Sequence, residues 1–156
     1  YFAAVEQQFR PELRGRPVGV SPVEGDSSCC IAVSIEAKRR GLRTGDRVRE
    51  ARRRVPELVI VKARPAFYVE VHKRIVASVE RCAPVDKVYS IDEMAVRLVG
   101  DQRQRDQAVS LAQAMKLSVA TEVGSVLSCS VGLAATRLLA KRGGRSGDYT
   151  RGGAPA

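Results

Sequence analysis

The chain from Pro65 onward alternates helical and extended sequence patterns, and this order restricts the folds open to it. Apolar residues recur at every fourth position from Phe67 to Val79, as in an amphipathic helix, and Pro84 ends the pattern. Two β-prone runs at residues 85–91 and 95–99 follow, then a helical pattern at 104–122, a strand pattern at 126–131 and the start of a helix at 134–141. One further strand ahead of Tyr1 would complete a βαββαβ sheet with its helices on one face. The sequence therefore predicts an α+β, ferredoxin-like fold that lacks its first strand, with a gap in the sheet for a slipped strand or a partner chain to close.

The first 64 residues carry shorter elements. A helix is expected at residues 2–9, strands at 17–20, 29–34 and 58–61, and helices at 36–40 and 44–54. In the later helix at 104–122, the expected apolar face consists of Val109, Ala112, Met115, Leu117 and Val119.

Adjacent carboxylates, Asp92 and Glu93, separate the two β-prone runs, and no Gly or Pro accounts for the bend. Side chains alternate faces along a strand, so only at a tight connection would both acids converge on one spot. Two readings stay open from these residues alone. One is a solvated hairpin turn, since acids are common in turns; the other is an oxygen-ligand site for Mg²⁺.

The composition indicates which kinds of binding partner and cofactor to expect. The 156 residues suffice for one domain, or one domain and part of another, and their net charge of +10 points to a polyanion such as nucleic acid. No apolar run of about 18 residues occurs, so no membrane association is expected. The four cysteines form no CxxC pair and His72 is the one histidine, so no zinc site is expected. A reducing cytoplasm suits these thiols, and a first residue other than Met suggests a cut from a longer chain.

Residues 38–54 form a basic run of nine Lys or Arg against two acids, a net charge of +7. Such a run is either a solvated helix face or a surface for phosphate groups. Residues 142–156, by contrast, form a Gly/Arg-rich tail without apolar periodicity, which we expect to be disordered. An RGG-type nucleic-acid contact and an unstructured or out-of-frame end are both open for the tail.

Four segments occur together in an order that resembles the Y-family translesion DNA polymerases, of the polymerase IV/V-like (UmuC/DinB-type) kind. The segments are Tyr1-Phe2-Ala3-Ala4-Val5-Glu6 with Pro11 to Val18, Glu36-Ala37-Lys38-Arg39-Arg40-Gly41, Tyr89-Ser90-Ile91-Asp92-Glu93, and Ser130-Val131-Gly132-Leu133-Ala134 through Leu138-Leu139-Ala140-Lys141. The third resembles the family's Ser-x-Asp-Glu motif. The resemblance covers residues 1–141, and it favours a functional role for the carboxylate pair.

The resemblance implies a palm of residues 1–9 and 66–141, with fingers at residues 10–65. The implied reaction is nucleotidyl transfer from a dNTP to the 3′ end of a primer, with two Mg²⁺ ions. Asp92 and Glu93 would be the catalytic metal ligands. Nucleotide-binding roles are implied for Phe2 as the steric gate and for Lys38 and Lys141 as phosphate contacts; without the resemblance, these three read as a core aromatic and solvated lysines. The basic run implies DNA-binding roles for Arg39, Arg40 and Arg43.

The sequence also departs from the family pattern. The family's first catalytic Asp would lie ahead of Tyr1, and its finger Thr, Tyr and Arg correspond here to Ala32, Ile35 and Lys38. We therefore expect this chain to be inactive or weakly active by itself. The alternatives are a non-catalytic DNA-binding or accessory module of the same fold and, less favoured, another palm enzyme such as a nucleotidyl cyclase. Expected partners are primer-template DNA and dNTP, with a sliding clamp or other repair proteins as candidates for the intact protein.

Overall fold

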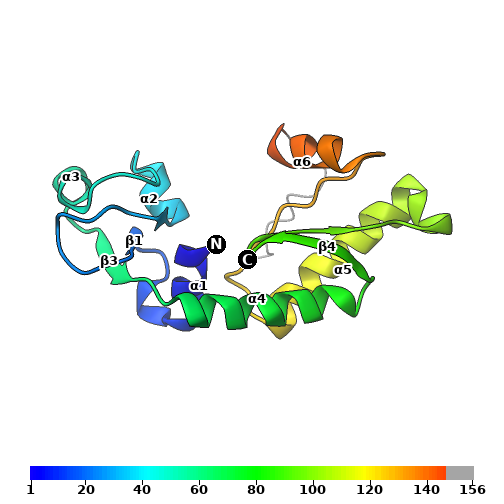
Figure 1. Cartoon of the computed structure of the whole chain (residues 1–156), viewed down its shortest axis with the longest axis horizontal. Helices are drawn as coiled ribbons and strands as arrows, with labels where there is room; N and C mark the ends of the chain where they lie inside the picture. The colour runs from blue at the N-terminus through cyan, green and yellow to red at the C-terminus, as the bar shows by residue number, and fades with distance from the viewer. Residues whose placement is uncertain (147–156) are drawn as a thin grey trace. The chain divides into compact units, whose positions relative to one another are not determined.

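The computed structural model describes residues 1–146, and it divides into two compact units at the bond between Val71 and His72 (Figure 1). The fold is α+β, as predicted. Within the described part of the chain, no helix combines the length and the apolar character needed to cross a membrane.

The first unit is built around a three-stranded sheet in the order β2-β1-β3. β1 pairs antiparallel with β2 and parallel with β3, so the chain between them crosses over through two helices. The elements are α1 (Phe2–Phe9), η1 (Pro11–Leu13), β1 (Val18–Ser21), β2 (Ala32–Val33), α2 (Ile35–Arg39), α3 (Val48–Arg54) and β3 (Val59–Lys62).

Small apolar side chains between this sheet and α2 and α3 form the core of the first unit. Gly19 on β1 permits the close packing, since a Cβ there would lie 2.8 Å from Cδ1 of Ile60 and 3.0 Å from Sγ of Cys30. Ser34 caps α2 by accepting a hydrogen bond from the Ala37 N–H at 3.3 Å. The core cluster consists of Cys30, Val33, Ala37, Leu42, Val48, Ala51, Val55 and Leu58.

Two predicted elements of this unit are shorter than expected. The helix predicted at 44–54 begins at Val48, because Gly45 has a φ of +96° and Arg47 forms an isolated bridge with Cys29. The strand predicted at 29–34 pairs with β1 only at Ala32 and Val33. Local backbone pairing, which periodicity does not encode, therefore fixes both boundaries.

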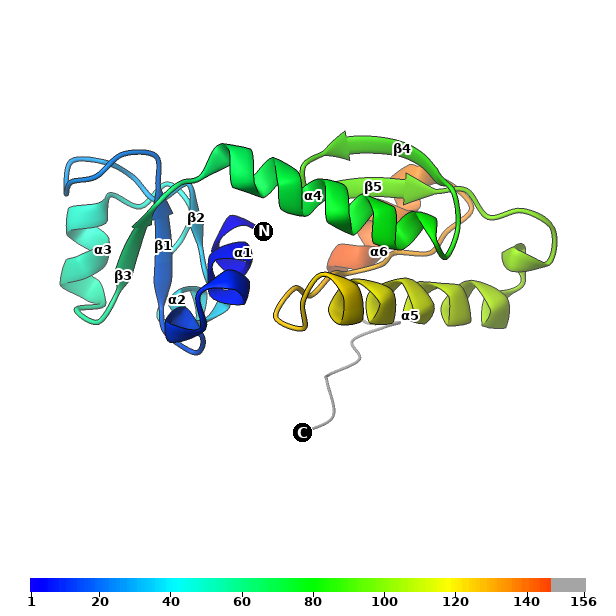
Figure 2. The same cartoon turned by 90° about the horizontal axis from the view of Figure 1, so that it is seen from below.

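The second unit combines a β-hairpin with two helices, residues 65–80 and 105–122, on one face, as the two views show (Figures 1 and 2). β4 and β5 pair antiparallel, with register irregularities between Val85 and Lys87 and between Val88 and Ser90. The elements are α4 (Pro65–Glu80), which begins in the first unit, β4 (Val85–Ser90), β5 (Glu93–Val96), η2 (Gly100–Arg103), α5 (Arg105–Glu122) and α6 (Arg137–Ser146).

A pair of serines joins helices α4 and α5. Ser78 is fully buried, its Oγ lies 2.7 Å from Oγ of Ser118, and the Ser118 hydroxyl also reaches the Ser78 carbonyl at 3.1 Å. Arg81 and Glu122 form an ion pair at the exposed end of the same interface. The buried residues of α5 are Ala108, Ala112, Met115 and Val119.

Two predictions for the second unit are wrong. Leu117 is 68% exposed, because it falls outside the face defined by Ala112, Met115 and Val119. Residues 126–131 do not form a strand. A strand needs a neighbour for its backbone N–H and C=O groups, and in the described residues β4 pairs only with β5. Residues 126–131, predicted as the strand on the far side of the expected gap, therefore have no strand to pair with in the described residues.

The division into palm and fingers stays a prediction, and the compact units follow contacts between elements. Helix α1 lies in the same unit as residues 10–65, since buried Glu6 on α1 bonds Arg64 and Tyr68. The first residues of the predicted disordered tail, 142–146, belong to helix α6. The rest of that tail, residues 147–156, lies outside the described residues.

Candidate functional site

The acidic pair lies at the turn of the β4–β5 hairpin. Ile91 and Asp92 form the two-residue connection, and Glu93 is the first residue of β5, paired with Ser90. None of the described non-glycine residues has a positive φ, so this turn is not one of the primed types that usually join strands through two residues. The irregular register between Val88 and Ser90 accommodates it instead. The predicted tight connection at the carboxylates is therefore confirmed.

Ser90 and Asp92 form a local hydrogen-bonded ring. The Ser90 hydroxyl donates to Oδ1 of Asp92 at 2.8 Å, and the Asp92 N–H donates to Oγ of Ser90 at 3.4 Å. Such a ring is typical of turns that use a short polar side chain. It orients the Asp92 carboxylate through Oδ1 and, among the described residues, leaves Oδ2 without a hydrogen bond, which gives the serine of the Ser-x-Asp-Glu segment a structural role.

Glu93 forms an ion pair with Lys141 of helix α6. Nζ of Lys141 lies 2.7 Å from Oε2 of Glu93, and both side chains are partly exposed. The two residues are 48 positions apart in the sequence, and the chain between them includes η2 and α5. Two of the residues singled out in the sequence are therefore adjacent in the structure, beside Asp92.

Two further contacts support the hairpin, and sequence reasoning missed both. Nδ1 of His72 on α4 lies 2.8 Å from the carbonyl oxygen of Ile91, and since a carbonyl only accepts, the proton must be on Nδ1. The guanidinium carbon of Arg137 lies 4.3 Å from the ring centroid of Tyr89, within cation–π range. The motif includes Tyr89, but no spacing in the sequence points to His72 or Arg137.

The carboxylate pair supplies the ligand type that Mg²⁺ prefers. Asp92 and Glu93 provide hard oxygen donors, and Mg²⁺ in proteins is commonly held by one or two carboxylates while it keeps several waters. The donor set fits one such ion. Among residues 1–146, no cluster of three or more His, Cys, Asp or Glu side chains is placed to hold a metal.

Phe2 belongs to a separate, well-connected site in the first unit. Its ring stacks on Tyr68 with centroids 4.6 Å apart and planes 19° from parallel. The Tyr68 hydroxyl donates to Oε1 of buried Glu6 at 2.7 Å, and Arg64 donates to both Glu6 oxygens, at 3.0 and 2.8 Å. Burial, with the hydrogen bond to Glu6, raises the pKa of Tyr68 to about 12. The ring of Phe2 therefore stacks on a tyrosine whose hydroxyl is fixed by its hydrogen bond to Glu6.

The candidate basic residues of the first unit are exposed. Lys38 and Arg39 lie on α2, whereas Arg40 pairs with Glu57. The backbone N–H of Arg43 donates to Oδ2 of Asp46 at 2.8 Å, and this bond, with the nearby Arg54 guanidinium, holds the pKa of Asp46 below its usual value.

The structure thus places the singled-out residues in two groups. Asp92, Glu93 and Lys141 lie together in the second unit, whereas Phe2 and the candidates between residues 38 and 43 lie in the first. Ala32 and Ile35, which correspond to hydrogen-bonding family residues, occupy β2 and the start of α2.

The fold and the hairpin carboxylates define a palm-type α+β protein with an acidic pair beside a helix lysine. Residues 1–143 match the model of the impB/mucB/samB family, and the chain belongs to this family. The resemblance to the Y-family DNA polymerases and the predicted α+β palm class are thereby confirmed.

Individual relatives agree. The chain is 33% identical over 145 residues to DNA polymerase IV of Pelotomaculum thermopropionicum, and 36% identical over 143 residues to that of Moorella thermoacetica. Each alignment covers 90% of this chain and 35% of the relative, so the chain spans about a third of the length of these proteins.

Solved structures show the same relationship. DinB from Sulfolobus solfataricus superposes with a TM-score of 0.83 at 26% identity, covering 95% of this chain and 43% of that one. An insertion ternary complex of Dbh DNA polymerase gives a TM-score of 0.77 at 25% identity, covering 90% and 42%.

Proposed function

We propose that this chain is part of the catalytic region of a translesion DNA polymerase, which transfers a nucleotide from dNTP to a primer 3′ end with Mg²⁺. The observation that carries the proposal is the carboxylate turn of Asp92 and Glu93, with the Lys141 ammonium 2.7 Å from Glu93. Nucleotidyl transfer depends chiefly on positioning and on stabilising negative charge at the phosphates. A carboxylate pair for a divalent cation and a nearby ammonium supply those two requirements.

Asp92 and Glu93 would hold Mg²⁺, and a bound ion would lower the pKa of the primer hydroxyl and neutralise charge on the phosphates. Lys141 would bind the triphosphate in place of Glu93. Its ammonium bonds Oε2 of Glu93 in this structure, and the several charged oxygens of a triphosphate attract an ammonium more strongly than one carboxylate does. We expect Lys141 to exchange Glu93 for the triphosphate when nucleotide binds, which frees a Glu93 oxygen.

The first unit would contact the sugar and triphosphate of the incoming nucleotide and the phosphates of the DNA. Phe2, held by its stacking on Tyr68, would exclude a ribose 2′-hydroxyl, and Lys38 would contact the triphosphate. Arg39 and Arg43 would contact DNA phosphates as they stand, whereas Arg40 must first release Glu57. The intact protein would act on primer-template DNA in the cytoplasm, with a sliding clamp or other repair proteins as candidate partners.

The described residues supply two carboxylate ligands, so we expect little synthesis from the 156-residue chain by itself. A primer-extension assay with Mg²⁺ tests this expectation, and robust templated incorporation would overturn it. Metal binding provides an independent readout: titration of Mn²⁺ with dNTP should weaken at least tenfold in Asp92→Asn and Glu93→Gln, but not in Asp101→Asn. Equal Mn²⁺ affinity in all three variants would refute the assigned ligands.

The ion pair between Glu93 and Lys141 also favours a second candidate, a DNA-binding or accessory module without catalysis, since a lysine already neutralises one of the two acids. This candidate requires DNA binding that needs no Mg²⁺ and is unchanged in Asp92→Ala combined with Glu93→Ala. Mg²⁺-stimulated binding of dNTP that the double variant loses would exclude it.

A further inference from the structure

The basic run of residues 38–54 separates into two kinds of arginine in the folded chain. Three arginines form ion pairs: Arg40 with Glu57, Arg52 with Asp26, and Arg54 with Asp46. Arg47, Arg49 and Arg53 reach no carboxylate among the residues that the structure describes. Acidic side chains therefore neutralise only some of the arginines in the run.

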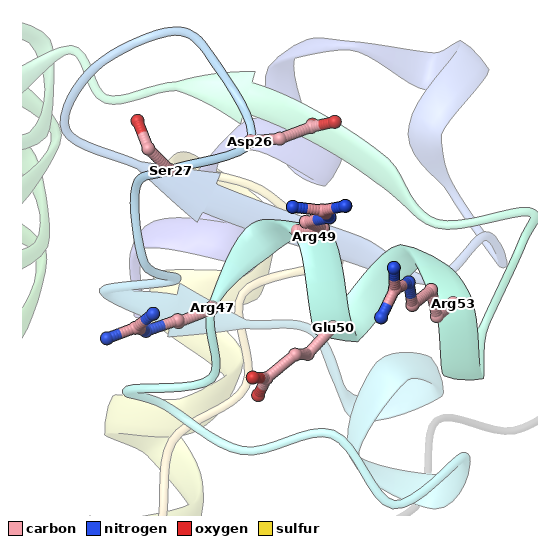
Figure 3. Close-up of a pocket in the computed structure, with 6 residues that line it drawn as sticks. All are labelled: Asp26, Ser27, Arg47, Arg49, Glu50 and Arg53. Atoms are coloured by element: carbon pink, nitrogen blue, oxygen red, sulfur yellow. The ribbon is translucent and has the colours of Figure 1, made fainter.

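The three unpaired arginines line one cavity of about 490 Å³, together with Asp26, Ser27 and Glu50 (Figure 3). Backbone bonds hold its two walls together, because the Arg49 N–H donates to the Asp26 carbonyl at 3.2 Å and the Val48 N–H donates to Ser28 at 2.9 Å. The cavity is thus formed by the loop before β2 and by helix α3 with the residue that precedes it, and not by side chains alone.

The charge of this cavity favours an anion. Asp26 is already neutralised by Arg52 at 2.8 Å, which leaves Glu50 against three guanidinium groups. Arg49 and Arg53 are four residues apart on α3, a spacing at which like charges destabilise a helix. A bound anion would remove that repulsion.

The chemistry of the lining points to phosphate and not to a base. Guanidinium groups bind phosphate oxygens through paired N–H donors, and the Ser27 hydroxyl adds another donor. The six lining residues include no aromatic or apolar side chain on which a base could stack. Binding at this cavity would accordingly depend on the phosphate backbone of a strand and not on its base sequence.

We propose that Arg47, Arg49 and Arg53, with Ser27, form a site for the phosphodiester backbone of a DNA strand, separate from the residues assigned to nucleotide and metal. The choice of DNA as the polyanion rests on the proposed function, whereas the phosphate preference rests on the cavity itself. Each phosphate contact releases counterions, so the site contributes to the salt dependence of binding.

The test compares two triple variants of equal charge in the 156-residue chain. Arg47→Gln, Arg49→Gln and Arg53→Gln remove the unpaired set, and Arg40→Gln, Arg52→Gln and Arg54→Gln remove the ion-paired set. Binding of single-stranded DNA is measured by fluorescence anisotropy over a range of salt concentrations. We expect the first variant to lower the slope of log K against log salt by about 2, at roughly 0.7 per lost contact, and the second to lower it by less than half as much.

An equal decrease of the salt slope in the two variants would overturn the proposal, because the slope would then depend on net charge alone. Inorganic tripolyphosphate serves as the second probe: if the unpaired set is needed for tripolyphosphate but not for DNA, the assignment to a strand is wrong. A third variant, with lysine at residues 47, 49 and 53, keeps the charge and should keep the slope if the site is formed, which guards against misfolding of the glutamine variant. Loss of Mn²⁺ binding in Asp92→Asn with an unchanged salt slope separates this site from the proposed catalytic one.

Discussion

Replacement of Tyr68 by Phe should destabilise the first unit in a pH-dependent way. Tyr68 is 1% exposed, and its hydroxyl donates to the fully buried carboxylate of Glu6 at 2.7 Å. A hydrogen bond to a charged group contributes about 1.5–3 kcal/mol. Arg64 still bonds both Glu6 oxygens in the variant, so we expect a loss near the lower end, about 1.5–2 kcal/mol at neutral pH.

The alkaline behaviour follows from the pKa of Tyr68. Burial, reinforced by Glu6, raises this pKa from 10.0 to about 12 in the folded chain. Because the folded value exceeds the unfolded one, the associated stability is fully present below pH 10 and is lost as pH rises through 12. Two pKa units correspond to about 2.7 kcal/mol, so the wild type should lose its advantage over Tyr68→Phe within this interval.

Urea unfolding followed by circular dichroism, at a series of pH values from about 8 to 12, measures the difference between the two chains. Tyr89→Phe is the matched control, since it removes a hydroxyl from a less buried tyrosine and keeps the ring that Arg137 contacts. A stability difference between wild type and Tyr68→Phe that stays constant from pH 10 to pH 12 would refute the buried network as the source of the shift.

Three further predictions concern stability. Burial acts to raise the pKa of Glu36, but hydrogen bonds, that of Gln7 first, together outweigh it and lower this pKa, and the Arg43 N–H lowers the pKa of Asp46. The unfolding midpoint in urea should therefore fall as pH drops below about 4, and an unchanged midpoint at pH 3 would contradict this. Met115→Ala should cost about 2–3 kcal/mol in the same assay, because Met115 is 8% exposed, whereas Leu117→Ala on the same helix should cost little. Ser118→Ala should cost about 1–2 kcal/mol by leaving buried Ser78 without its partner, and a thermal midpoint equal to wild type would show that the bond contributes nothing.

Much of the local structure follows from the sequence. Helix α1 has the predicted bounds, α4 begins at Pro65 as predicted, and the carboxylates lie at the predicted hairpin turn. These features depend on side-chain periodicity and on turn and helix-start chemistry, which act over a few residues. The four ordered motifs likewise indicate the family from the sequence alone.

Other features depend on contacts between distant segments, and only the tertiary structure decided them. Residues 126–131 have the composition of a strand but no neighbour to pair with. Arg49 and Arg52 look alike in the sequence, yet Asp26 pairs with Arg52 and leaves Arg49 in the cavity. Contact with Ile91 gives His72 its place beside the acidic turn. A residue's pattern predicts its local conformation, but its partners depend on which distant atoms the fold brings within hydrogen-bonding reach.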